Sequence, residues 1–154
     1  MSRDSTSHAL PGGHARDLLA ETLRGQVARQ GVLELEAQGS SMEPTVPGGS
    51  LLRIEPMTQA PSRGELIAFV PDRGALLCCH RVVAHDGARV VTQGDRHGAP
   101  DPSAPHDRII GVVRSFTLGG RAYALGPDAP RPRPSLYRRQ RQRIARALRR
   151  LRAA

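Results

Sequence analysis

The sequence predicts a mainly β domain that follows a single helix. Apolar residues recur at helical spacing up to Gln30, and beyond Gly31 the apolar spacing shortens to every second residue. Short apolar runs then alternate with turn sequences, in a chain that holds 16 glycines and 13 prolines. Aromatic residues make up only 3% of the chain. We therefore expect a compact β-barrel or sandwich with a core of Val, Leu and Ile.

The helix is expected between His14 and Gln30. Leu19, Leu23 and Val27 are spaced four residues apart and would share one helix face. Gly31 stands where a helix commonly ends in a left-handed residue. Gly25 inside the segment weakens the prediction, because an interior glycine costs a helix about 1 kcal/mol.

Seven segments are predicted as strands. Val32–Ala37 alternates apolar residues with two glutamates that should face water. Asp86-Gly87 between two apolar runs is the strongest hairpin signal in the chain. The remaining strand candidates are Ser50–Ile54, Glu65–Val70, Leu76–Ala84, Arg89–Gln93, Ile109–Phe116 and Arg121–Leu125.

The charge distribution divides the chain into three parts. We expect a disordered leader at 1–13, one domain at 14–126, and a Pro/Arg linker with a basic amphipathic helix at 127–154. All 23 basic side chains are Arg, and ten of them lie beyond residue 130 without any acid, so the domain itself is nearly neutral. The tail at 135–152 is either a solvated end or a helix that contacts anionic membrane lipid. Nucleic acid is the less favoured partner, because no aromatic platform accompanies the arginines.

Targeting features are absent from the sequence pattern. No run approaches the roughly 20 apolar residues that span a bilayer, and the first thirty residues lack the apolar centre of a signal peptide. The adjacent Cys78 and Cys79 do not suit an ordinary disulfide. These features predict a cytoplasmic protein without a transmembrane segment, with peripheral membrane contact as an option for the tail.

A candidate nucleophile and base can be found by elimination. Ser40 and Ser41 lie in a loop after the first strand, in the sequence Gly-Ser-Ser-Met-Glu-Pro. Reactive groups are commonly placed on such loops, and Ser beside Gly is equally typical of an ordinary loop. The chain has no Lys, and Arg stays protonated at working pH, so an amine base is excluded. Of the six histidines only His80 falls within a strongly apolar strand. Its ordinary interpretation is a hydrogen-bonded strand residue, and its functional one is a general base.

Two carboxylates are candidates for orienting His80. Asp95 follows the strand Arg89–Gln93, and Asp101 lies six residues further on. A carboxylate that accepts from one imidazole nitrogen fixes the tautomer and leaves the other nitrogen free to take a proton. Both residues are equally typical of turn-capping Asp, and the sequence does not choose between them.

Five blocks in order resemble the signal peptidase superfamily of serine peptidases. They are GSSMEPTVPGGSLL, RGELIAFV, HRVV, VTQGDRHGAPD and IIGVV, and the resemblance spans about residues 32–113. It implies the small β-barrel-like domain shared by signal peptidases and related repressors. The His-Arg-Val segment and the Gly-Asp block are similar to the Ser/His type of the endoplasmic reticulum and archaea. The usual bacterial type pairs Ser with Lys.

The resemblance implies a function and a set of site residues. Ser41 would attack the peptide bond of a protein or peptide precursor, and His80 would act as its base with Asp95 or Asp101 behind it. The Ser41 backbone N–H would bind the oxyanion, and its neighbours Gly39, Ser40 and Met42 would contact substrate or oxyanion. No cofactor is implied. The chain departs from the pattern at His97-Gly98, where the endoplasmic-reticulum type tends to carry Asn.

Two alternatives belong to other classes of function. A catalytically silent peptide-binding module on the same fold, tethered to membrane or nucleic acid by its Arg-rich tail, would retain most of these residues. A zinc site is suggested by Cys78-Cys79-His80 with His85 and His97 downstream. Adjacent strand residues point to opposite faces, however, so the two cysteines would not readily share one ion. The sequence therefore predicts no metal site.

Overall fold

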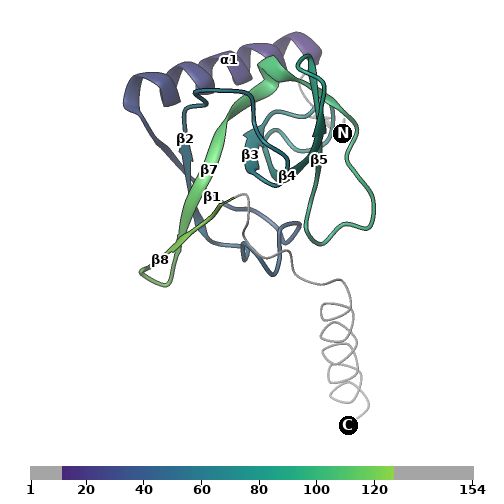
Figure 1. The fold of residues 1–154 in the computed structure, drawn as a ribbon. Helices are drawn as coiled ribbons and strands as arrows, with labels where there is room; N and C mark the ends of the chain where they lie inside the picture. Colours follow the sequence, from purple (N-terminus) through teal and green to yellow (C-terminus); the bar gives the residue numbers. More distant parts are fainter. Residues whose placement is uncertain (1–11, 127–154) are drawn as a thin grey trace, which may run out of the picture.

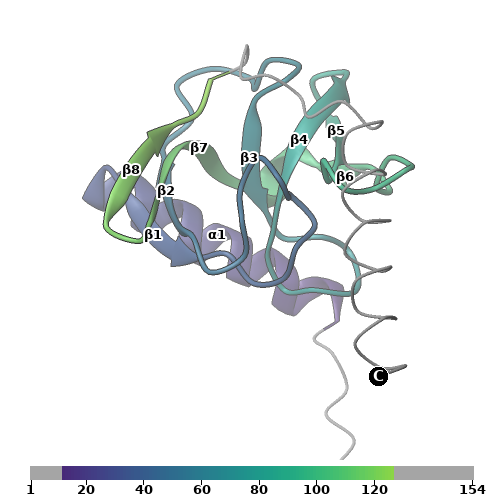
Figure 2. The ribbon, with the colours of Figure 1, turned by 90° about the horizontal axis from the view of Figure 1, so that it is seen from below.

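The computed structural model describes residues 12–126, which form one helix and an eight-stranded antiparallel sheet (Figure 1). The sheet curls into a half-barrel, and α1 lies across one side of it (Figures 1 and 2). The elements in chain order are α1 (Gly13–Gln30), β1 (Leu33–Glu36), β2 (Leu51–Glu55), β3 (Leu66–Phe69), β4 (Cys78–His85), β5 (Arg89–Gln93), β6 (Ala104–Pro105), the 3₁₀ turn η1 (His106–Arg108), β7 (Ile109–Leu118) and β8 (Arg121–Ala124).

The strands β1 and β6 stand at the two ends of the strand order. It runs β1-β2-β7-β3-β4-β5-β6, and β8 pairs with β7 beyond this path. β7 is the longest strand and pairs with β2, β3 and β8. Among the described strands, β1 pairs only with β2, so its other edge offers unpaired backbone groups.

The core has two parts on opposite faces of the central strand β3, all four residues of which are buried. Leu66 and Ala68 join a cluster that receives α1, β1, β2 and β7. Ile67 and Phe69 join a second cluster with β4, β5 and β6. The alternation along a strand explains this division, since successive side chains point to opposite faces. β3 thereby fixes the distance between the two halves of the molecule.

Most of the predicted elements are found in the structure, with small shifts at their ends. The mainly β class with one preceding helix is confirmed. The helix ends at Gln30, and Gly31 adopts φ 74° with its N–H bonded to the Val27 carbonyl. The glutamates of β1 are exposed as expected. The strand β6 and the turn η1 were not predicted, because segments of two and three residues, one of them a proline in β6, carry no periodicity. The predicted leader up to residue 11 and the tail beyond residue 126 lie outside the described residues.

The helix is fastened to the sheet by a buried cation that the apolar pattern did not predict. Arg16 is almost completely buried, and its guanidinium donates to the carbonyls of Pro71, Gly74 and Ala75 at 2.7–2.9 Å. Hydrogen bonds to three carbonyl oxygens offset the free-energy cost of burying the charged guanidinium. The loop between β3 and β4 is therefore held by α1. On the same helix the apolar Leu18 side chain is 57% exposed, so the buried face of α1 does not follow hydrophobicity alone.

Within residues 12–126, no helix has the length and apolar character that crossing a bilayer requires.

Candidate active site

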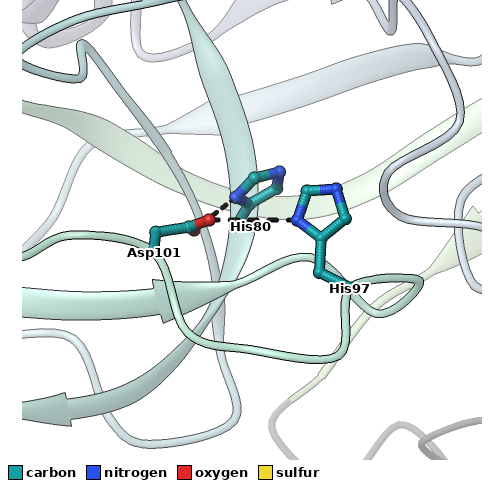
Figure 3. A group of neighbouring side chains, drawn as sticks. All are labelled: His80, His97 and Asp101. Atoms are coloured by element: carbon teal, nitrogen blue, oxygen red, sulfur yellow. Dashed lines mark hydrogen bonds and ion pairs between the residues drawn. The ribbon is translucent and has the colours of Figure 1, made fainter.

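Ser41, His80 and Asp101 form a continuous chain of hydrogen bonds. The Ser41 hydroxyl lies 3.1 Å from His80 Nε2, and His80 Nδ1 lies 2.5 Å from Asp101 Oδ2. Figure 3 shows the second of these contacts. The three residues come from the β1–β2 loop, from β4 and from the β5–β6 loop. The distances match those needed for proton transfer between a nucleophile and a base.

His80 is held rigidly by the sheet. It pairs with Ile67 of β3 in the strand register and is only 5% exposed. The edge of the Phe69 ring packs against it, with 6.1 Å between ring centroids. Both polar atoms of the imidazole still have partners, so its burial leaves neither one unsatisfied.

Asp101 determines which nitrogen of His80 carries the proton. Its carboxylate accepts from the Thr92 hydroxyl at 2.7 Å, and its backbone N–H donates to the Thr92 carbonyl at 2.8 Å. An ionised carboxylate can only accept, so His80 Nδ1 must donate to it. The Nε2 atom is then free to accept the proton of Ser41. Of the two acids that the sequence left open, Asp101 is therefore the one at the imidazole.

Asp95 has a different partner. Its carboxylate receives two hydrogen bonds from the Arg81 guanidinium, at 2.9 and 2.7 Å, and a third at 2.5 Å from the Thr45 hydroxyl. Arg81 also donates to the Gly64 carbonyl at 2.8 Å. The pair is almost fully buried, with the Arg81 and Asp95 side chains 2% and 6% exposed. Asp95 thus holds the loop of Ser41 through Thr45, and its carboxylate forms no hydrogen bond or ion pair with His80.

The loop that carries Ser41 is pinned against the segment after β5. The Ser41 carbonyl accepts from the Arg96 N–H at 2.9 Å, and the Asp95 N–H donates to the buried Met42 sulfur at 3.5 Å. Gly94 permits this close approach, because a Cβ there would lie 2.8 Å from the Ser41 carbonyl oxygen. The Glu43–Pro44 bond in the same loop is cis.

The predicted oxyanion groups lie where the Ser41 loop turns. Within residues 12–126 the Ser41 N–H donates no hydrogen bond, which leaves it available to a developing oxyanion. The Ser40 hydroxyl accepts from the Arg96 guanidinium at 2.5 Å, and Gly39 adopts φ 76°. Met42 is buried in the core, where its side chain anchors the loop and forms part of the wall of the cavity beside Ser41.

A largely apolar cavity of about 200 Å³ opens beside the hydroxyl of Ser41. It lies between the end of β1 and the start of β4. A second cavity of about 190 Å³ lies on the other side of His80, beside Asp101. The first cavity is lined by Leu35, Glu36, Ala37, Gln38, Gly39, Ser41, Met42, Val46, Leu52, Ile54, Ala68, Ala75, Leu77, Cys78, Cys79 and His80.

The cysteines are free thiols that resist ionisation. Burial raises the pKa of Cys78 to about 11, and the negative charge of Asp101 adds to the effect. Burial likewise raises the pKa of Cys79 to about 12, with smaller contributions from Cys78 and Asp95. A thiolate is the form that attacks electrophiles and binds metals. Burial therefore disfavours the reactive thiolate form of both cysteines at neutral pH.

The sequence did not predict the roles of three residues at or beside the site. Thr92 holds Asp101, Arg81 neutralises Asp95, and His97 lies 3.9 Å from the Asp101 carboxylate through its Nδ1 (Figure 3). Thr92 offered a usable signal, because it shares the buried face of β5 with Val90 and a buried Thr requires a hydrogen-bond partner. His97 was named in the sequence as a departure from the family pattern and as a candidate zinc ligand, but neither observation placed it beside Asp101.

The chain was compared with protein-family models, with curated proteins and with solved structures, and none of the three comparisons found a match.

Proposed function

We propose that this protein is a serine endopeptidase of the signal-peptidase kind, with Ser41 as nucleophile, His80 as base and Asp101 as orienting acid. The observation that carries the proposal is the unbroken chain Ser41–His80–Asp101 at the wall of an apolar cavity. The five sequence blocks that resemble signal peptidases support it independently, because they single out Ser41 and His80 without reference to geometry.

The reaction would proceed through an acyl-enzyme. Ser41 Oγ bonds to the scissile carbonyl carbon while its proton passes to His80 Nε2. The carbonyl oxygen takes the negative charge and is bound by the Ser41 N–H. Collapse breaks the C–N bond, and the imidazolium returns the proton to the leaving amine. Water then attacks the ester by the same route, which releases the acid product and restores Ser41.

The unpaired edge of β1 is where we place the substrate backbone. The cavity beside Ser41 is bounded on one side by Leu35–Gly39, which run from β1 into the nucleophile loop. An extended peptide can add to such an edge through main-chain hydrogen bonds, with one side chain lodged in the apolar cavity. We therefore propose a protein or peptide precursor as substrate, cleaved where an apolar side chain fills the cavity.

The test compares protein N-termini in host cells that express the wild-type chain, Ser41→Ala or Ser115→Ala. Ser115 lies on β7 in the hairpin with β8 and serves as a matched control. We expect new N-termini with the wild type and with Ser115→Ala, and their loss with Ser41→Ala. Unchanged termini in all three would overturn the peptidase proposal.

The second candidate function is peptide binding without hydrolysis, favoured by the apolar cavity next to an unpaired strand edge. It predicts that wild type and Ser41→Ala capture the same peptides from a random extended library and that neither cleaves them. Cleavage by the wild type alone would exclude it.

The Arg-rich tail supports a further proposal about location. We propose that residues 135–152 bind the protein to anionic lipid, because the chain beyond residue 130 contains ten arginines and no Asp or Glu. Sedimentation with vesicles of neutral and of anionic lipid tests this. Replacement of Arg138, Arg139 and Arg141 by Gln should weaken binding to anionic vesicles only, and equal binding to both lipids would contradict it.

A further inference from the structure

His97 lies beside the proposed catalytic residues without taking part in their hydrogen bonds. It belongs to the loop after β5, and its ring meets that of His80 edge-on, with centroids 5.3 Å apart and an interplanar angle of 83°. The Nδ1 atoms of both rings face the Asp101 carboxylate, at 2.5 Å for His80 and 3.9 Å for His97 (Figure 3). One donor atom from each of the three residues lies within 4.8 Å of the others.

Two imidazoles and one carboxylate are the ligand types that borderline transition metals prefer. Zn²⁺ sites with three protein ligands leave the fourth position to water. Ligand atoms in a tetrahedral zinc site stand about 3.4 Å apart, given bonds of about 2.0–2.2 Å. Atoms that lie up to 4.8 Å apart must therefore approach by about 1.4 Å. The His97 side chain is 46% exposed and can move inward. His80 Nδ1 and Asp101 Oδ2, which lie 2.5 Å apart, must instead separate by about 0.9 Å as the ion replaces their hydrogen bond.

The surroundings are those of a metal ligand set with a supporting shell. The Thr92 hydroxyl donates to Asp101 Oδ2 and orients the carboxylate, as partners of metal-bound carboxylates do. The nearest buried cation, Arg81, is neutralised by Asp95 on the opposite face of β4. An ion can enter from the exposed His97 side. Mg²⁺ and Ca²⁺ are disfavoured, because they require oxygen ligands.

We propose that His80, His97 and Asp101 form a Zn²⁺ site and that an ion bound there switches the peptidase off. The inhibition, although not the binding, rests on the proposed function. A metal on Nδ1 of His80 leaves the ring proton on Nε2. That Nε2–H can only donate toward Ser41 and no longer accepts its proton. The ion also takes the Asp101 carboxylate away from His80. The base thus loses both its free Nε2 lone pair and its hydrogen bond to Asp101.

The zinc ligands suggested by the sequence overlap with this site only in part. Cys78 and Cys79 are not in this site, and the His85 ring neighbours His106 at 6.0 Å between centroids and not His80. Only His80 and His97 of the five residues considered there come together, and Asp101 completes the set.

Binding is tested first, by calorimetric titration of the metal-free full chain with ZnCl₂. We expect one ion per chain for the wild type and for His85→Ala, the matched control. His97→Ala should lower the affinity at least about tenfold. Equal affinity for wild type and His97→Ala, or loss of binding in His85→Ala alone, would overturn the site. Chelator-treated protein must give the same isotherm on a second titration, since a mere precipitate would not.

Inhibition is tested as the ratio of cleavage rates without and with Zn²⁺, measured for each variant against itself. We expect a ratio of at least about tenfold for the wild type and His85→Ala, reversed by chelator, and a ratio near one for His97→Ala at the same metal concentration. A wild-type rate that rises with Zn²⁺ would overturn the inhibitory role. If the metal-free wild type cleaves nothing while the titration still depends on His97, the proposed function fails and the metal site stands.

Discussion

His80 and Arg81 are neighbours on β4 that project to opposite faces, and each is bound by an aspartate from the segment after β5. On one face Asp101 meets an imidazole that can gain or lose a proton. On the other face Asp95 meets a guanidinium that stays charged, in a pair that is almost fully buried. Two carboxylates bonded to neighbouring residues of β4 thus have different chemical capacities.

The difference shows that the basic partner decides what each carboxylate does. Arg81 donates two parallel hydrogen bonds to Asp95, and Asp95 holds the Ser41 loop by accepting from Thr45. Asp101 makes a single bond to His80, which has Ser41 on its other nitrogen. The first arrangement supports the structure, and the second leaves one proton free to move. Substitution of each aspartate by the same residue separates the two roles.

The largest effect is expected from Asp101→Asn on turnover. The amide can donate to Nδ1 and so favour the tautomer that cannot accept from Ser41. We expect kcat to fall about 10³–10⁴-fold, with the free energy of unfolding changed by only about 1 kcal/mol. Peptide cleavage and urea unfolding on the same preparation measure both. A loss of less than tenfold would assign the orienting role elsewhere.

Asp95→Asn should affect folding first. It leaves the Arg81 charge buried beside a neutral amide, and breaking one side of a buried pair costs about 3–5 kcal/mol. Urea unfolding should therefore shift far more than for Asp101→Asn. The double variant Arg81→Met with Asp95→Leu removes both charges and should regain most of the lost stability. If Asp95→Asn unfolds like the wild type, the pair has no structural role.

Cys78 reports on the Asp101 side of the comparison. Its pKa of about 11, against an ordinary 9.0, lowers the thiolate fraction about 100-fold at neutral pH. Higher intrinsic nucleophilicity recovers part of this, so alkylation by iodoacetamide should be about tenfold slower than in the unfolded chain. The measurement uses a Cys79→Ser background in metal-free buffer. Asp101→Asn should speed the reaction, because it removes a negative charge, and Asp95→Asn should not.

Thr92→Val gives the smallest expected change. It removes the hydroxyl that holds Asp101 Oδ2 while it retains the shape of the buried side chain. We expect kcat to fall about three- to tenfold, as for loss of one hydrogen bond to a charged group. Thr45→Val is the matched control, because Thr45 donates to Asp95. This variant should lower the free energy of unfolding, and its kcat per folded molecule should fall less than that of Thr92→Val. Equal losses of kcat in both variants would remove the distinction between the two carboxylates.

The fold was predictable wherever the sequence repeats a period. The alternation of Leu and Glu in β1 and the Gly31 helix end are local patterns, and both are found in the structure. β6 was not predictable, because its two residues pair with β5 only through tertiary contact. The burial of Arg16 depends on three carbonyls more than fifty residues away, which no local pattern contains.

The site was predictable in its residue types more than in its pairings. Ser41 and His80 followed from elimination and from the resemblance, and the structure places them in hydrogen-bond contact. The choice between Asp95 and Asp101 was not available, because both follow β5 in polar segments. What separates them is the side of β4 that each loop reaches, and this depends on the path of the chain around Gly94, where a Cβ would meet both Ser41 and His97.

The hydrogen bonds from Arg16 to the β3–β4 loop have a consequence for the rate at which a peptide would bind. The loop that Arg16 holds contributes Ala75 and Leu77 to the cavity beside Ser41 and Pro71 to the cavity beside Asp101. To open, this loop would have to give up three hydrogen bonds to one cation at once. The loop therefore loses its conformational entropy when the chain folds. Binding of the proposed peptide substrate carries no further cost for ordering it. Association should therefore proceed as for a rigid receptor, at about 10⁵–10⁷ M⁻¹s⁻¹, without a slow closing phase.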